Sequence, residues 1–146
     1  MTTTPDGPIV VTAAVIERDG CFLVTRRPEG THLAGHWEFP GGKCEDAETP
    51  ERCLQRELRE ELGVDVMVVE EMFRTRYRYA HPDAAAALGT PPGGRYLDLR
   101  FFRCVLNGVP RPRQGQQMRW VPRHALSALT FPPADAEFIA QLVGGR

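Results

Sequence analysis

The stretch that decides the fold runs from Gly42 to Val64 and reads GKCEDAETPERCLQRELREELGV. Thr49 and Pro50 predict the start of a helix, because threonine can accept a hydrogen bond from a first-turn amide and proline is tolerated at the first helical position. Gly63 predicts its end. In between, leucine recurs every four residues, at Leu54, Leu58 and Leu62. This spacing predicts a short amphipathic helix packed on a sheet.

The same segment carries three carboxylates, Glu57, Glu60 and Glu61, at positions i, i+3 and i+4. On a helix they share one face, and like charges so close repel unless something positive lies among them. Oxygen ligands select hard cations, and Mg²⁺ is usually held by a few carboxylates together with waters and substrate phosphates. The pattern therefore indicates chemistry on phosphates. The alternative is a solvated helix face, which is what most charge runs on helices are.

The whole segment resembles the Nudix box, Gly-x5-Glu-x7-Arg-Glu-apolar-x-Glu-Glu-x-Gly-apolar, and fills every fixed position of it. Agreement over so many fixed positions favours a functional site over a solvated face. The resemblance implies the α/β fold of Nudix proteins. This is an α/β/α sandwich with a mixed sheet between helices, in which the box forms a loop, a helix and a loop.

Two further segments look like the MutT subgroup of that family: Trp37-Glu38-Phe39-Pro40-Gly41-Gly42-Lys43 and Phe131-Pro132-Pro133-Ala134-Asp135. The resemblance spans most of Ile9 to Leu142, except an insertion at His81–Gly94. It implies Mg²⁺-dependent hydrolysis of a (deoxy)nucleoside triphosphate to monophosphate and pyrophosphate, with Mn²⁺ able to substitute. The substrate could be CTP-like or an oxidised nucleotide such as 8-oxo-dGTP.

Two other functions remain open. One is hydrolysis of ADP-ribose or dinucleoside polyphosphates, against which the segment ending in Asp135 argues. The other is a nucleotide sensor without turnover, against which the intact box argues.

The resemblance also assigns roles to single residues. Glu57, Glu60 and Glu61 would bind Mg²⁺ together with the backbone carbonyl of Gly41. Glu48 and Arg56 would form a supporting pair, which suits a brace between loop and helix better than a set of ligands. We expect substrate contacts from Arg27, His32, Glu38, Phe39, Lys43, Arg95 and Asp135, of which His32 and Asp135 follow from the resemblance. Among them, Lys43 and Arg27 suit phosphates, as a point charge and a bidentate fork.

His32 and His36 have a spacing that could suggest zinc. They flank a glycine in an expected loop and have no cysteine nearby, so ordinary loop histidines are favoured.

Gln114 is a departure from the subgroup. An acidic residue commonly stands shortly before the tryptophan of the late strand, and glutamine, aligned there, cannot take a proton. A box glutamate, a water activated by the metal or a residue of His81–Gly94 would then serve as the base, or activity would be reduced.

Asp135 also allows two interpretations. An ionised carboxylate there would accept hydrogen bonds from a base and favour cytosine or guanine, whereas a helix cap near Ala136 would only add stability.

The rest of the chain predicts strands and one further helix. Asp19-Gly20 should turn an opening hairpin, and Arg26–Trp37 and His81–Gly94 should be loops. The expected strands are Ile9–Ile16, Cys21–Thr25, Val64–Val69, Phe73–Tyr79, Tyr96–Val105 and Arg119–Val121, and the closing helix is Ala134–Val143. Residues 1–146 should form one domain, with flexible tails at 1–8 and 144–146.

Composition excludes several classes of protein. The chain has 146 residues, 42% of them hydrophobic and 25% charged, which excludes a disordered tail and a membrane protein. A net charge of −1 lacks the positive field that duplex nucleic acid recruits. No leader or spanning segment is evident, and four scattered cysteines without a CxxC pair predict free thiols in a reducing cytoplasm. Either a monomer or a homodimer fits.

Overall fold

The computed structural model describes residues 7–31, 33–78 and 96–145 of the chain. The strands in these ranges are β1 (Ile9–Val15), β2 (Glu17–Arg18), β3 (Cys21–Arg26), β4 (Trp37–Glu38), β5 (Gly41–Lys43), β6 (Asp65–Tyr77), β7 (Leu97–Asn107) and β8 (Gln117–Pro122). The α-helices are α1 (Pro50–Leu62) and α3 (Ala136–Gly144), and the 3-10 helices are η1 (Arg123–Ala128) and η2 (Pro133–Asp135).

The strands form two sheets. In the first, the order is β5-β1-β7-β6, and β1 runs parallel to β7 while the other neighbours are antiparallel. In the second, β3 pairs with β2, β4 and β8, all antiparallel. The predicted mixed sheet is thus present, but a second sheet accompanies it. Apolar alternation predicts strands without saying which strands pair.

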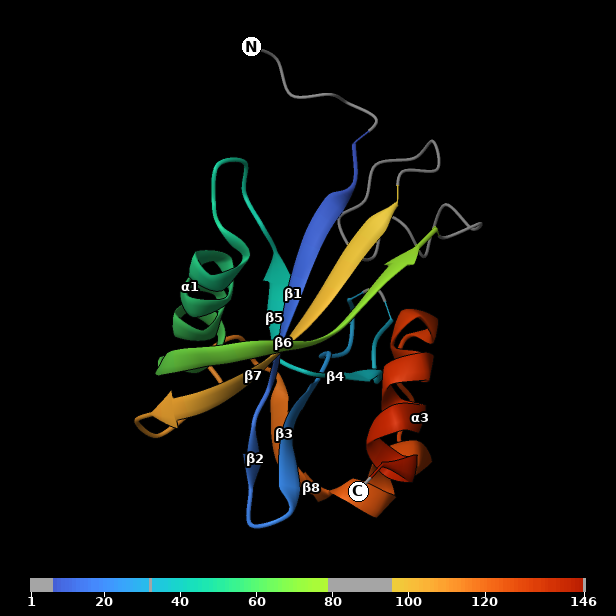
Figure 1. Ribbon diagram of the computed structural model, residues 1–146. Coiled ribbons are helices and arrows are strands. Elements are labelled where there is room, and N and C mark those ends of the chain that lie inside the picture. The colour runs from blue at the N-terminus through green and yellow to red at the C-terminus, as the bar shows by residue number, and fades with distance from the viewer. Residues whose placement is uncertain (1–6, 32, 79–95, 146) are drawn as a thin grey trace.

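The two α-helices lie on opposite sides of the strands (Figure 1). On one side, Leu54, Leu58 and Leu62 of α1 pack into a core with residues of β1, β3, β6 and β7. On the other side, Phe138 of α3 packs against two other aromatic rings. The distance between ring centroids is 4.4 Å to Phe101 and 5.9 Å to Phe39. The α/β/α sandwich is therefore confirmed.

Helix α1 has the ends that the sequence predicts. Thr49 Oγ1 accepts a hydrogen bond from the Arg52 amide at 3.2 Å, and Pro50 occupies the first turn. Gly63 ends the helix with φ 61°, and its amide donates to the Arg59 carbonyl at 3.0 Å. The leucine stripe is buried. Burying each leucine contributes about 2 kcal/mol, so the stripe fixes which face of α1 points away from the sheet.

β6 differs from the prediction, because Asp65–Tyr77 is one strand of 13 residues where two strands, Val64–Val69 and Phe73–Tyr79, were expected. The charged pair Glu70-Glu71 interrupts the apolar alternation and suggested a break. In the structure both carboxylates pair with arginines of β7, Glu70 with Arg103 and Glu71 with Arg100. Register shifts after Val68 and after Glu71 absorb the irregularity, so the ladder continues.

Other boundaries shift by a few residues. Asp19 and Gly20 turn the opening hairpin with φ values of 53° and 79°, as predicted. The closing helix begins at Ala136, after the 3-10 turn η2. The expected loop Arg26–Trp37 ends in the short strand β4, and β5 was not predicted. The insertion His81–Gly94 and most of the expected N-terminal tail lie outside the described residues, and the single domain stays a prediction.

The prediction of four free thiols is wrong for two of them. Cys44 and Cys53 form a disulfide, with their Cα atoms 5.2 Å apart. The loop after β5 turns back along α1, so two positions nine residues apart meet, which no CxxC pattern reveals. Cys21 and Cys104 are free. None of the helices in the described ranges is both long and apolar enough to cross a bilayer.

Candidate active site

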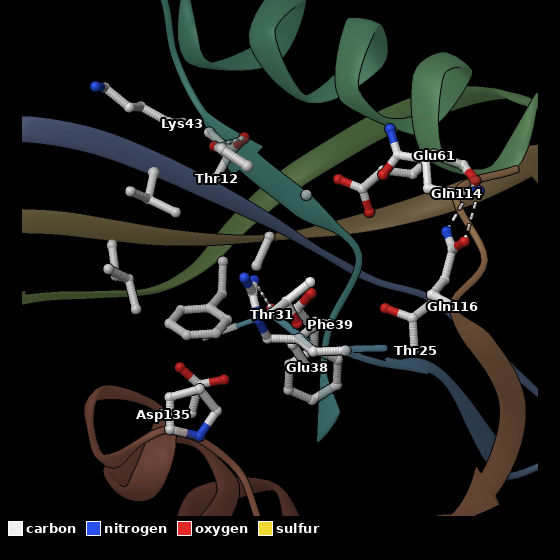
Figure 2. A pocket seen from close by; sticks show the side chains of 18 of the residues that line it. Thr12, Thr25, Thr31, Glu38, Phe39, Lys43, Glu61, Gln114, Gln116 and Asp135 are labelled. Carbon is white, nitrogen blue, oxygen red and sulfur yellow. Dashed lines mark hydrogen bonds and ion pairs between the residues drawn. The ribbon is translucent and has the colours of Figure 1, made fainter. Parts of the chain in front are cut away.

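A cavity of about 390 Å³ is lined by residues of β1, β5 and β7 and by Asp135 at the end of η2. Figure 2 shows that side chains from distant parts of the sequence line it. Glu61 and Gln114 lie near each other at one end, which we call the box end. Glu38, Phe39 and Asp135 lie at the other, which we call the base end. The cavity therefore joins the two segments that the sequence singled out separately.

Negative charge is crowded at the box end. The Glu57 and Glu61 carboxyl groups are within hydrogen-bonding contact, and the Gly41 amide donates to Glu61. Burial, the contact with Glu57 and the charge of Glu38 raise the pKa of Glu61 to about 10. Burial and neighbouring carboxylates disfavour the ionised form of such a group, and positive charge beside it would favour that form. An oxygen-only set at such a place fits a hard divalent cation.

Two glycines let the loop come close to the carboxylates. A Cβ at position 42 would clash with the Glu57 carboxylate, and one at position 41 would clash with the Thr12 carbonyl oxygen. A larger residue at either position would therefore push β5 away from β1 and α1. The Gly41-Gly42 pair thus sets the depth of the box end.

Arg56 braces the loop against the helix. Its Nε and Nη2 donate to the two carboxylate oxygens of Glu48 at 2.6 and 2.9 Å, and Nη2 also donates to the Lys43 carbonyl at 3.3 Å. The hydrogen bonds from Arg56 and from the Glu45 amide lower the pKa of Glu48 to about 2. The pair that the resemblance implies is therefore present, and it connects the loop to the helix.

Glu60 lies apart from the other two box carboxylates. Its side chain is 52% exposed and accepts from Arg56 Nη1 at 3.3 Å, while the same nitrogen donates to Glu57 at 3.0 Å. Within residues 7–31, 33–78 and 96–145, no three metal-binding side chains converge. The structure therefore brings Glu57, Glu61 and Gly41 together and turns Glu60 toward Arg56, which supplies positive charge between Glu57 and Glu60.

Gln114 does reach the box end, beside Glu61 (Figure 2). Gln116, which no sequence pattern indicated, lies next to both and forms a hydrogen bond with the backbone of each. Its Nε2 donates to the Glu61 carbonyl at 3.0 Å, and its Oε1 accepts from the Gln114 amide at 2.8 Å. No sequence pattern marks Gln116, because its partners are backbone atoms 55 and two residues away.

The base end holds two acids in an apolar setting. Asp135 is only 7% exposed, and burial and the charge of Glu38 raise its pKa to about 7. Burial also raises the pKa of Glu38, against the opposing effect of Arg27, whose Nη1 lies 3.8 Å from Glu38 Oε1. Phe39 is buried and packs on Phe131 with ring centroids 5.5 Å apart.

These facts correct two expectations about Asp135. It precedes α3 but makes no capping hydrogen bond with its side chain, so the cap interpretation is wrong. The expectation of an ionised carboxylate is also wrong, because a group with a pKa of about 7 is partly protonated near neutral pH. Asp135 can therefore donate as well as accept a hydrogen bond near pH 7.

Only some of the other residues that were expected to contact substrate lie in the described part of the chain. Arg27 and Lys43 line the cavity, whereas His32 and Arg95 lie outside the described residues. His36 contacts the Leu33 carbonyl through Nδ1 at 3.1 Å, which suits a loop histidine. Thr12 and Thr25 line the cavity and are almost fully buried, and both were missed because they lie in strands that read as apolar.

Comparison with known proteins gives a match over nearly the whole chain. The family model of the NUDIX domain matches residues 7–142. The chain belongs to the Nudix family. The CTP pyrophosphohydrolase of Escherichia coli (strain K12) is 53% identical to this Nudix hydrolase over 130 residues, which is 88% of this chain and 85% of that protein. The 8-oxo-dGTP diphosphatase of Haemophilus influenzae is 37% identical over 139 residues, 92% and 91% of the two chains.

The solution structure of the E. coli ORF135 protein superimposes with a TM-score of 0.77 at 30% identity, covering 94% of this chain and 90% of that one. These findings confirm the MutT-like resemblance, the α/β fold and the hydrolase class of the Nudix protein.

Proposed function

We propose that this Nudix hydrolase cleaves a nucleoside triphosphate to the monophosphate and pyrophosphate, using Mg²⁺, for which Mn²⁺ can substitute. The observation that carries the proposal is the single cavity with an acidic box end and a base end lined by Phe39 and Asp135. Arg27 and Lys43 line the same cavity, and both suit phosphates. A nucleotide with its base at one end would present its phosphates to the other.

Glu57, Glu60, Glu61 and the Gly41 carbonyl are the groups we propose to hold the cation. When bound, Mg²⁺ would neutralise charge on the phosphate oxygens and lower the pKa of a water. The protein restrains these groups in advance: the Gly41 amide orients Glu61, and Arg56 holds Glu57 and Glu60. Because Gln114 cannot take a proton, we assign the general base to a box glutamate.

For the base, we propose cytosine or guanine, including 8-oxo-guanine. Both carry an exocyclic amine as a hydrogen-bond donor, and an ionised Asp135 would accept from it. A protonated Asp135 or Glu38 would donate to a ring nitrogen or carbonyl of the same base. Uracil has carbonyl groups to accept such a bond but no exocyclic amine to donate one. The relatives named as acting on CTP and 8-oxo-dGTP support this choice.

A panel of nucleotides tests the proposal. The purified protein is incubated with Mg²⁺ and each of CTP, dCTP, dGTP, 8-oxo-dGTP, UTP, ADP-ribose and a dinucleoside tetraphosphate, and products are separated by ion exchange. We expect monophosphate and pyrophosphate, fastest from a cytosine or guanine nucleotide. Fastest cleavage of ADP-ribose or of the dinucleotide would replace the substrate class, and tight binding without turnover would support the sensor alternative that Gln114 raises.

The proposal also covers the location, the oligomeric state and the partners of the protein. We propose a cytoplasmic protein, monomeric or homodimeric, without a duplex nucleic acid or membrane partner. The Cys44–Cys53 bond bears on this, because disulfides persist mainly in oxidising compartments. Alkylation of cell lysates under acid quench, followed by mass spectrometry, would report whether the pair is reduced in the cell, as a cytoplasmic location predicts.

A further inference from the structure

The segment between β7 and β8 covers the C-terminal end of α1. The last carbonyls of a helix have no partner within it and need donors from elsewhere. Here the Arg111 amide donates to the Leu62 carbonyl at 3.0 Å, and the Arg113 amide donates to the Glu61 carbonyl at 2.9 Å. The Glu61 carbonyl accepts a second hydrogen bond, from Gln116 Nε2 at 3.0 Å. The β7–β8 segment is thus attached at the residue whose side chain enters the cavity.

Gln116 uses both halves of its side-chain amide. The nitrogen binds the Glu61 carbonyl, and the oxygen accepts from the Gln114 amide at 2.8 Å. A single side chain therefore links the backbone of Glu61 to the backbone of Gln114, as the dashed lines at Gln116 in Figure 2 indicate. Glutamine carries a donor and an acceptor at this length, whereas glutamate lacks the donor when ionised.

We propose that Gln116 is a positioning residue that holds Gln114 against Glu61 at the box end of the cavity. The proposal rests on the proposed function, in which Glu61 helps to hold the cation. Gln114 is exposed, so burial does little to hold it, and the bond to Gln116 restrains its backbone. Displacing a reacting group by about 1 Å can cost on the order of a hundredfold in rate.

Two variants separate the two hydrogen bonds. Gln116→Ala removes both, whereas Gln116→Glu keeps an acceptor for the Gln114 amide and places a carboxylate against the Glu61 carbonyl. Gln117→Ala is the matched control, because Gln117 is the next residue, is exposed and does not line the cavity. Melting temperatures of all variants verify that they are folded.

The first measurement is amide hydrogen exchange in the protein without nucleotide or metal. We expect faster exchange at Gln114 in Gln116→Ala, by about tenfold, and retained protection in Gln116→Glu and Gln117→Ala. The Arg113 amide, which donates to the Glu61 carbonyl without help from the Gln116 side chain, is the internal control and should stay protected. Unchanged exchange at Gln114 in Gln116→Ala would overturn the proposal.

The second measurement is Mn²⁺ binding to the free protein, followed by the electron paramagnetic resonance of unbound Mn²⁺. Residues that orient metal ligands typically change metal affinity 10- to 100-fold, so we expect Gln116→Ala and Gln116→Glu to raise the Kd about tenfold and Gln117→Ala to leave it unchanged. Equal Kd values in all four proteins would contradict the proposal. This readout holds even if the wild type hydrolyses no triphosphate, so failure of the proposed function is distinguishable.

The third measurement is turnover of the best triphosphate from the panel. We expect kcat of Gln116→Ala to fall about tenfold or more while KM changes less than threefold, since the base end and the phosphate contacts are untouched. A raised KM with an unchanged kcat would assign Gln116 to substrate binding and overturn the positioning role.

Discussion

The box end and the base end of the cavity both gather acids, but they manage the charge differently. At the box end, Arg56 pairs with Glu48, Glu57 and Glu60, and burial together with the neighbouring carboxylates raises the pKa of Glu61 to about 10. At the base end, Arg27 offsets Glu38 in part, and burial pushes the pKa of Asp135 to about 7 instead. Under the proposed function, the first cluster would hold a cation against the phosphates, and the second would form hydrogen bonds with the neutral base.

The largest effect is expected at the box end. Glu61→Gln and Glu60→Gln should each lower kcat a hundredfold or more, because each removes a proposed ligand of the cation that would stabilise developing charge. Neither belongs to the leucine stripe, so the melting temperature should stay close to that of the wild type. EDTA should have the same effect as the variants. Glu51→Gln, on the first turn of the same helix, is the control. Wild-type rates in EDTA would contradict the proposed requirement for Mg²⁺.

A second expectation concerns the disulfide that joins the loop after β5 to α1. Reducing the Cys44–Cys53 bond, or replacing both residues by serine, should lower the free energy of unfolding by about 2–3 kcal/mol, the chain-entropy value for a loop of this length. Urea unfolding with and without reductant measures it. The free cysteine Cys21 provides the control variant Cys21→Ser. Identical unfolding midpoints in reducing and oxidising buffer would mean that the bond contributes no stability.

At the base end, Asp135→Asn should change the ranking of cytidine, guanosine and 8-oxo-guanosine triphosphates by about tenfold in kcat/KM, the order of one buried hydrogen bond. A carboxyl oxygen can accept a hydrogen bond when ionised and donate one when protonated. In the asparagine amide the oxygen can only accept and the nitrogen can only donate. Glu137→Gln, exposed on the first turn of α3, is the matched control. An unchanged ranking would move base recognition away from Asp135.

The same variant should alter how stability depends on pH. The pKa of Asp135 is raised in the folded state, so the folded protein binds this proton more tightly than the unfolded chain, and stability is lost as pH rises. The loss should extend from about pH 4, the unfolded value, to about pH 7. Asp135→Asn should therefore gain stability relative to the wild type over that interval. Melting temperatures in EDTA at pH 4 to 8 measure the difference, and parallel curves would contradict the shifted pKa.

The smallest effect is expected for Gln114→Glu, which would restore an ionisable oxygen beside Glu61. We expect kcat to rise several-fold, with a new ionisation in the pH profile, because a carboxylate there could take a proton. Gln117→Glu adds the same charge outside the cavity and should leave the rate unchanged. The same rate and pH profile in both variants would place the base elsewhere.

The box end could be predicted from the sequence because its chemistry is local. Thr49, Gly63 and the leucine stripe fix α1, and helical spacing alone puts Glu57 beside Glu61. Even there, the turning of Glu60 toward Arg56 was not visible, since it depends on side-chain conformation.

The base end could be predicted only as a pair of segments. The raised pKa of Asp135 arises from burial among residues distant in sequence, and Thr12, Thr25 and Gln116 enter the cavity through sheet pairing and loop contacts. The disulfide escaped prediction for the same reason, because the turn after β5 brings Cys44 to Cys53. Residue patterns thus predicted the groups that act through local spacing and missed those that act through tertiary contact.

The most direct test of the central claim is a ³¹P NMR time course of the protein with CTP and 8-oxo-dGTP in ¹⁸O-enriched water and Mg²⁺. The account predicts nucleoside monophosphate and pyrophosphate as the only phosphorus products of at least one nucleotide, with one ¹⁸O incorporated per cleavage, and no reaction once EDTA is added. Release of orthophosphate, or no cleavage of either nucleotide in the presence of Mg²⁺, would contradict it.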